Sequence, residues 1–180
     1  MKKSNRSLRR RPLFTPVWLS MIGGLVFLLV GSWTWNSLGT VTVIFVRHAD
    51  TTGSEAQRPL TAAGALRAES LAKMLQDVPL AAVYVNELPR TRATGQGVAA
   101  LTGAELIEVP SADFDKLPGM IKRHKGEVVL VVGHSNTVPE LIKRLGGESA
   151  EIGETDFSQL LILTTGLLES TRVLPLRYQP

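Results

Sequence analysis

The sequence predicts an α/β fold, a three-layer sandwich with a mainly parallel central sheet, helices on both faces and one hydrophobic helix before it. The first observation is that short runs of β-branched and aromatic residues alternate with segments of helix length, the pattern of parallel strands joined by helices. The second is that no charged residue occurs between Arg11 and Arg47. The chain therefore combines one α/β domain with an apolar N-terminal segment.

Charge is distributed unevenly along the 180 residues, a length that suits one domain with a short extension. Six of the 20 basic residues lie within residues 1–12, and the other 14 stand against 16 acids, a balance of −2. This remainder shows no basic patch interleaved with aromatics, which argues against a nucleic-acid partner. The absence of cysteine excludes disulfides, thiolate nucleophiles and Cys-ligated metal sites.

The N-terminal region predicts export of the domain. Residues 1–12 form a basic tail, expected to be cytoplasmic, and residues 13–35 have the length and composition of a transmembrane signal anchor, with tryptophans near both ends. A single-pass protein of the inner membrane is then expected, with residues 36–40 as linker and residues 41–176 as an extracytoplasmic or periplasmic domain. The alternative is a cleaved signal peptide that releases the domain to the periplasm, although no Ala-x-Ala site follows.

The domain itself is expected to alternate strands and helices in chain order. Apolar runs predict strands, apolar periodicity predicts helices, and Thr61, Pro89 and Gly146 are expected at helix ends. The predicted strands are 41–46, 80–85, 105–109, 127–132, 160–164 and 171–175, the last two forming a hairpin around Gly166. The predicted helices are 62–75, 89–101, 113–124 and 137–145.

Two of these strands end in a histidine. The run 41–46 is followed by Arg47 and His48, and the run 127–132 by Gly133 and His134. Arg90 follows the strand 80–85 after a short loop. Ligands of open α/β sheets bind beyond the carboxyl ends of the strands, so these side chains are expected to converge.

Two imidazoles and two guanidiniums suit a phosphoryl group. Arginine forks bind phosphate oxygens in a bidentate manner, a neutral imidazole is a competent nucleophile, and a protonated one steadies the equatorial oxygens. Metal binding is the competing use of two histidines, but neighbouring arginines repel a dication and no carboxylate lies at ligand spacing. The expectation is a site that needs neither metal nor other cofactor.

The set of motifs resembles the histidine phosphatase superfamily, which has the phosphoglycerate-mutase-like fold, and in particular its small bacterial members. The residues are Arg47-His48-Ala49, Arg90 within Pro89-Arg-Thr-Arg-Ala-Thr94, and Gly133-His134-Ser-Asn136. The resemblance implies that His48 becomes phosphohistidine, that Arg47, Arg90 and His134 bind the phosphoryl group, and that Asn136 is a further substrate-binding candidate. A general acid is also implied, for which Asp113 is the first candidate and Asp115 and Glu87 are the others.

Some positions depart from the pattern of this family. Ala49 stands where Gly is frequent, Asn86 stands where Ser commonly precedes the second arginine, and Ala93 replaces a Gln. These changes affect packing and support of the pocket rather than its four charged or titratable groups.

The function expected from the sequence is a metal-independent phosphomonoesterase with a phosphohistidine intermediate. Its substrate is expected to be a small phosphorylated envelope metabolite or sugar; a mutase is disfavoured because the domain is short. Two alternatives stay open: a non-catalytic phosphate-binding or scaffold domain, and a protein phosphohistidine phosphatase if the domain faces the cytoplasm. The oligomeric state is not predicted.

Overall fold

The computed structural model describes residues 17–53, 57–148, 151–166 and 171–179, without the side chains of residues 17 and 33–38. The chain divides after Trp35 into two compact units. In the first, α1 (Val17–Gly39) is a single helix whose apolar side chains are exposed, Leu25 at 58% and Phe27 at 78%. Within the described residues, no helix meets the length and hydropathy that a membrane span requires. The transmembrane helix predicted over residues 13–35 is therefore not confirmed, and residues 13–16 lie outside the described part.

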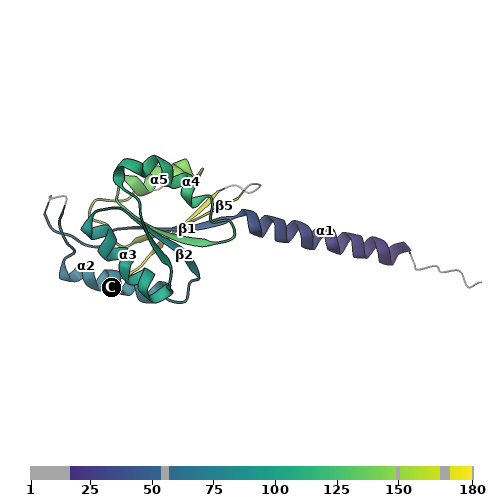
Figure 1. The fold of residues 1–180 in the computed structure, drawn as a ribbon, viewed down its shortest axis with the longest axis horizontal. Coiled ribbons are helices and arrows are strands. Elements are labelled where there is room, and N and C mark those ends of the chain that lie inside the picture. The colour runs from purple at the N-terminus through teal and green to yellow at the C-terminus, as the bar shows by residue number, and fades with distance from the viewer. Residues whose placement is uncertain (1–16, 54–56, 149–150, 167–170, 180) are drawn as a thin grey trace, which may run out of the picture. The chain divides into compact units, whose positions relative to one another are not determined.

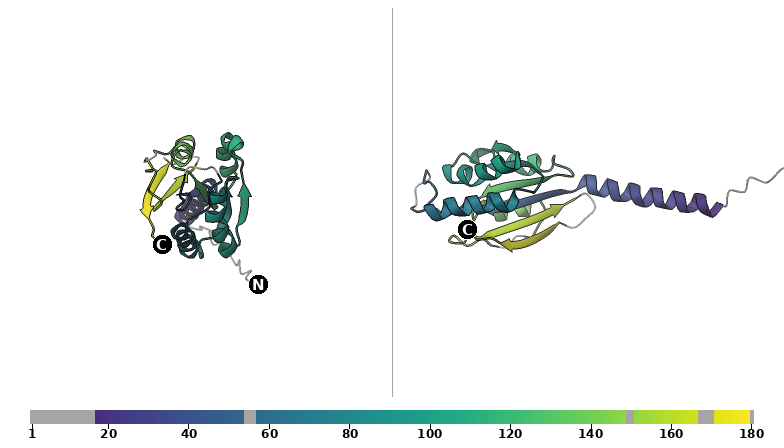
Figure 2. Two further views of the ribbon diagram at one scale, coloured as in Figure 1. Left: turned by 90° about the vertical axis from the view of Figure 1, so that its left-hand side faces the viewer. Right: turned by 90° about the horizontal axis from the view of Figure 1, so that it is seen from below.

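The second unit contains one six-stranded sheet in the order β3-β2-β4-β1-β5-β6. Its strands are β1 (Val41–Arg47), β2 (Leu80–Val85), β3 (Glu105–Glu108), β4 (Val128–Gly133), β5 (Gln159–Thr165) and β6 (Arg172–Arg177). The first four run parallel, and β5 and β6 are antiparallel to their neighbours at one edge. The prediction of a mainly parallel sheet with a closing antiparallel strand pair is confirmed, and Figures 1 and 2 show the strands between the helices.

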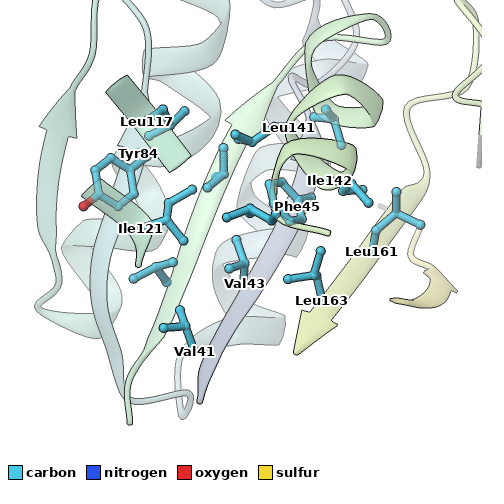
Figure 3. Packing of buried hydrophobic residues seen from close by; sticks show 14 of the residues in the cluster. Val41, Val43, Phe45, Tyr84, Leu117, Ile121, Leu141, Ile142, Leu161 and Leu163 are labelled. Carbon is cyan, nitrogen blue, oxygen red and sulfur yellow. The ribbon is translucent and has the colours of Figure 1, made fainter. Parts of the chain in front are cut away.

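Helices cover both faces of this sheet, as predicted. On one face, α2 (Ala62–Leu75) and α3 (Pro89–Thr102) pack on side chains such as Ile44 and Leu130. On the other, α4 (Leu117–Ile121) and α5 (Thr137–Arg144) pack on Val43 and Phe45, the layer drawn in Figure 3. The three-layer architecture is thus confirmed, because each helix buries its apolar stripe on one face.

One predicted helix differs in form. The segment expected as a continuous helix over 113–124 is a 3₁₀ turn, η1 (Ser111–Lys116), followed by the short α4. Pro118 lies in the first turn of α4, where its missing N–H is not needed. Inside a continuous helix the same proline would remove a hydrogen bond and clash with the preceding turn, so the helix begins anew at Leu117.

The sheet brings the functional segments together at one end, where its parallel strands have their carboxyl ends. Arg47 lies opposite Gly133 in the parallel β1–β4 pair, and the N–H of His48 donates to the Gly133 carbonyl at 2.9 Å. The β2 strand lies on the other side of β4, so the loop that leads to Arg90 leaves from the same edge. Parallel pairing therefore places the residues after three strands next to one another.

Candidate active site

His48 is a buried imidazole with a defined tautomer. It lies directly after β1 and only 1% of it is exposed. Its Nδ1 lies 2.8 Å from the carbonyl oxygen of Ala49. A carbonyl can only accept, so Nδ1 carries the proton and Nε2 presents a lone pair. That is the form of imidazole that attacks phosphorus.

A threonine on α3, Thr94, connects the backbone after His48 to the backbone of Arg90. The buried N–H of Ala49 donates to Oγ1 of Thr94 at 3.0 Å, and the Thr94 hydroxyl donates to the carbonyl of Arg90 at 2.7 Å. Thr94 is fully buried, so water has no access to these groups. One hydroxyl therefore connects the backbone beside His48 with the first turn of the helix that carries Arg90.

His134 lies next to His48, as predicted. The two ring centroids are 5.2 Å apart with an interplanar angle of 64°. The backbone N–H of His134 donates to Oγ1 of Thr137 in the first turn of α5, at 2.9 Å. Two imidazoles that follow different strands are thus in edge-to-face contact, so one phosphoryl group can lie beside both.

Asn86 supports the ring of His134. Its Nδ2 lies 3.0 Å from Nε2 of His134, while its Oδ1 accepts the N–H of Leu88 at 3.2 Å and the hydroxyl of Thr91. Because Oδ1 accepts these donors, Nδ2 is the amide atom that faces His134, and Nε2 of that ring accepts. The departure from the usual Ser therefore supplies an amide donor to the site.

Arg47 is almost completely buried beneath the histidines, with 6% exposed. Its Nη1 donates to the carbonyl of Gly153 at 2.9 Å and to that of Glu154, and its guanidinium lies 4.2 Å above the ring of Phe157. Its Nε is a buried donor that has no hydrogen-bond partner among the described residues. An anion beside His48 is a natural acceptor for such a donor.

The electrostatics of the site favour neutral imidazoles. Burial, assisted by the charges of His134, Arg47 and Arg90, lowers the pKa of His48 to about 3. Burial and the charges of Arg90, Arg47 and Arg58 lower the pKa of His134 to about 4. Both imidazoles are thus neutral at neutral pH. A bound phosphate dianion raises the pKa of each ring, because an opposite charge stabilises the protonated form.

Arg58 belongs to this cluster and was not among the predicted site residues. Its charge lowers the pKa of Arg47, Arg90 and His134, so it lies close to all three. The bridge between Thr51 and Leu60 returns the loop toward β1, and Arg58 donates to the Gly53 carbonyl at 2.5 Å. The only sequence signal was an arginine three residues before the Thr61 helix cap.

Phe157 is the other site residue that sequence reasoning missed. Its ring centroid lies 5.8 Å from that of His48, and it stacks under Arg47. It comes from the connection between α5 and β5, which has no sequence pattern of its own. No local signal could have assigned it.

The three candidate acids differ in the groups that they contact. Asp113 pairs with Lys116 at 2.6 Å, and Asp115 pairs with Arg144. Oε2 of Glu87 accepts the N–H of Ser111 at 2.9 Å, and its charge raises the pKa of His134. Of the three, Glu87 is the carboxylate that acts electrostatically on the site.

Two further observations complete the site. Asn136 is the N-cap residue of α5, and its side chain makes no capping hydrogen bond. Among the described residues, no three histidine, aspartate or glutamate side chains are grouped so that they could hold a metal ion.

Comparisons with known proteins agree with this geometry. Residues 43–112 match the family model of the histidine phosphatase superfamily (branch 1). The structure is similar to that of the protein histidine phosphatase SixA complexed with tungstate, at 20% identity and a TM-score of 0.60, covering 76% of this chain and 96% of the other. No curated protein sequence matches significantly.

Two more solved structures share the fold. A mycobacterial glucosyl-3-phosphoglycerate phosphatase is 13% identical with a TM-score of 0.57, covering 78% of this chain and 99% of the other. A phosphoglycerate mutase of Plasmodium falciparum is 17% identical with a TM-score of 0.56, covering 79% and 95%. The match over residues 43–112, which include Arg47, His48 and Arg90, and the fold shared with these structures are what the chain has in common with the histidine phosphatase superfamily.

Proposed function

We propose that the protein is a phosphomonoesterase that works through a phosphohistidine on His48. The observation that carries this proposal is the tautomer of His48, whose Nδ1–H is held by Ala49 and whose ring lies close enough to Arg47 and Arg90 for their charges to lower its pKa. Arg47, Arg90 and His134 bind the phosphoryl group in this proposal, with Arg58 as a further cation and Asn136 as a further candidate. Guanidinium charges serve in place of a metal, so the reaction is proposed to be metal-independent.

The reaction proceeds in two displacements. The Nε2 lone pair of His48 forms a bond to phosphorus as the ester P–O bond breaks, and the departing oxygen takes up a proton. Water then attacks the phosphohistidine, the P–N bond breaks, and inorganic phosphate leaves with His48 restored. The three arginines and His134 stabilise the charge on the equatorial oxygens in both steps.

The proton for the leaving oxygen requires an acid. We propose Glu87 before Asp113, the first candidate from sequence, because Glu87 interacts electrostatically with His134, whereas Asp113 and Asp115 pair with surface cations. Backbone hydrogen bonds lower the pKa of Glu87. A bound phosphate dianion raises this pKa again, because a neighbouring like charge disfavours the ionised form. Glu87→Gln is then expected to lower the rate for alkyl phosphates more than for aryl phosphates, whose leaving groups need less protonation. Asp113→Asn serves as the control.

The substrate class is proposed as a small phosphorylated molecule, with an envelope metabolite or sugar as the expectation from sequence. Support comes from the solved phosphatases that share the fold, one of which is a glucosyl-3-phosphoglycerate phosphatase. A protein phosphohistidine is the alternative, since another of these structures is that of a protein histidine phosphatase. Location separates the two, because an exported domain does not meet cytoplasmic phosphoproteins.

The test of the function is hydrolysis of p-nitrophenyl phosphate together with trapping of a phosphoenzyme. His48→Ala is expected to lower kcat by about 10³-fold or more. The control His124→Gln alters a histidine that bonds Tyr84 and Glu127, and it is expected to retain activity. Chelators are expected to have no effect, and the trapped phosphate should be labile in acid and stable in base. No turnover and no phosphoenzyme would favour a binding or scaffold domain.

The location of the domain is proposed from the sequence alone. The basic residues 1–12 and the uncharged residues 13–35 support an inner-membrane anchor, with a domain outside the cytoplasm. A reporter fused after Pro180 is expected to read out as external, and fractionation separates an anchored chain from one released by signal cleavage. A cytoplasmic readout would contradict the proposal and would favour protein substrates.

A further inference from the structure

A cavity of about 230 Å³ opens beside His134, on the α4 and α5 side of the sheet. Its floor is formed by the carboxyl ends of β2 and β4, and its walls by α5 and the segment 109–117. Three of its lining residues, Tyr84, Leu117 and Leu141, are labelled in Figure 3 within the apolar layer on this face. The cavity therefore extends from the edge of the sheet that carries the histidines into an apolar part of the domain.

The walls of this cavity are apolar. Apart from His134, no residue that lines it has an ionisable group that is charged near neutral pH, and the deeper walls are aliphatic or aromatic, namely Val109, Phe114, Leu117, Val138 and Leu141. A sugar placed here would bury hydroxyl groups against methyl groups and a phenyl ring. Each hydroxyl left without a partner costs about 1–3 kcal/mol.

The polar groups around the cavity already have protein partners. The hydroxyl of Tyr84 is bonded to Nε2 of His124 at 2.7 Å, and Oγ1 of Thr137 accepts the backbone N–H of His134 at 2.9 Å. Asn86 is bonded to His134, Leu88 and Thr91. The lining thus offers a polyol few hydrogen-bonding groups, chiefly the hydroxyls of Ser111 and Thr137, which accept bonds from Asn86 and from the backbone of His134 and can still donate.

The cavity adjoins the candidate active site at His134, whereas His48, Arg47 and Arg90 do not line it. His134 and Asn86 line its mouth, and the ring of His134 is the one that lies 5.2 Å from the ring of His48. A phosphoryl group that contacts both imidazoles is therefore close to the apolar space. Whatever is esterified to that phosphate lies within reach of the cavity.

We infer that the cavity binds the apolar alcohol portion of the substrate, so that the preferred substrate is a phosphomonoester of an alkyl or aryl alcohol rather than of a sugar. This inference rests on the proposed function. His48 forms its bond to phosphorus, the P–O bond to the apolar alcohol breaks, the alcohol leaves with a proton, and water releases the phosphate from His48. An apolar cavity of about 150 Å³ accommodates benzene. The volume here suits a six-membered ring with a short extension.

Two esters of primary alcohols make a matched test. Cyclohexylmethyl phosphate has the carbon skeleton of glucose 6-phosphate in outline, without the hydroxyl groups and the ring oxygen. The two leaving groups are of the same type, so their difference reports on the binding of the ring. We expect kcat/KM to be at least about tenfold higher for the cyclohexylmethyl ester, the effect of one unmatched hydroxyl.

Filling the cavity provides the second arm of the test. Leu117→Trp places a larger ring in the space, and it is expected to lower the ratio of kcat/KM for cyclohexylmethyl phosphate to that for methyl phosphate by about tenfold. The control Leu101→Trp makes the same change on α3, where Leu101 is 55% exposed, and the ratio should not move. Val109→Ala, which enlarges the cavity, is expected to shift the preference toward longer alkyl esters, and it reports on the cavity if Leu117→Trp fails to fold.

The outcomes separate this inference from the proposed function. Equal or better turnover of glucose 6-phosphate overturns the inference and leaves the phosphatase in place. If no ester is hydrolysed, the proposed function fails, and binding of the two esters to the His48→Ala variant, measured by calorimetry, then decides the inference. Tighter binding of the cyclohexylmethyl ester supports the cavity as an apolar subsite, and equal or weaker binding refutes it.

Discussion

Thr94 offers the sharpest test of how the fold positions the nucleophile. Thr94→Val keeps the shape of the side chain and removes the hydroxyl that joins the Ala49 N–H to the Arg90 carbonyl. The carbonyl of Ala49 accepts the hydrogen bond from Nδ1 of His48, so the loss of the bond to the N–H of the same residue loosens the backbone that sets the imidazole tautomer. Both stability and catalysis are expected to suffer.

The magnitude follows from burial. Thr94 and Ala49 are both 0% exposed, so water cannot replace the lost acceptor of the Ala49 N–H. A buried donor left unsatisfied costs about 1–3 kcal/mol, which we expect as the loss in the free energy of unfolding. If the poorer orientation of the His48 imidazole also raises the free energy of the transition state by about 1.4 kcal/mol, kcat falls about tenfold.

The same helix supplies a matched control. The hydroxyl of Thr102 also donates to the carbonyl four residues earlier, Val98, at 2.8 Å and accepts a backbone N–H, that of Ala104, at 3.3 Å. Thr102 is only partly buried and lies at the far end of α3. Thr102→Val is therefore expected to cost less stability and to leave kcat unchanged.

The assays are urea unfolding and hydrolysis of p-nitrophenyl phosphate for the two variants and the wild type. Amide hydrogen exchange at Ala49 adds a local readout, since this N–H should lose protection in Thr94→Val. The reasoning is refuted if both variants lose the same stability and Thr94→Val retains full kcat.

Three further predictions concern charge and packing. In the unfolded chain the imidazoles have the ordinary pKa of about 6.5, above the pKa values of His48 and His134 in the folded protein. The unfolded state therefore binds more protons, and the free energy of unfolding should fall as the pH is lowered from about 6.5 to about 4. A free energy that does not change with pH in urea unfolding contradicts this prediction. Arg58→Gln should weaken inhibition by inorganic phosphate about tenfold, whereas the surface change Arg92→Gln should not. Gly64→Ala should lower stability by at least about 1–3 kcal/mol in thermal unfolding, because its Cβ would lie 2.2 Å from the carbonyl oxygen of Asp50.

Much of the fold could be predicted because its signals are local. Apolar runs of strand length, the Thr61 cap and Pro89 at a helix start each act within a few residues, and the structure has all of them. The helix expected over 113–124 was wrong in form because Pro118 stops one helix and suits the start of another, and the sequence pattern around it fits both arrangements.

Some residues of the candidate site could likewise be predicted from local sequence patterns, and others could not. The pairing of His48 with His134 could be predicted because parallel strands bring their carboxyl ends to one edge, and the structure places the two rings 5.2 Å apart. The roles of Arg58 and Phe157 could not, because each reaches the site through a loop whose path depends on contacts distant in sequence.

The sequence by itself determined the strand and helix order, the edge of the sheet that carries the histidines and the positive character of the site, because these follow from local patterns and from the rules of parallel sheets. Only the tertiary structure decided the tautomers of the imidazoles, the carboxylate that acts on His134 and the apolar cavity beside it. The physical reason is that hydrogen-bond partners, burial and empty space are properties of residues that meet only when the chain is folded.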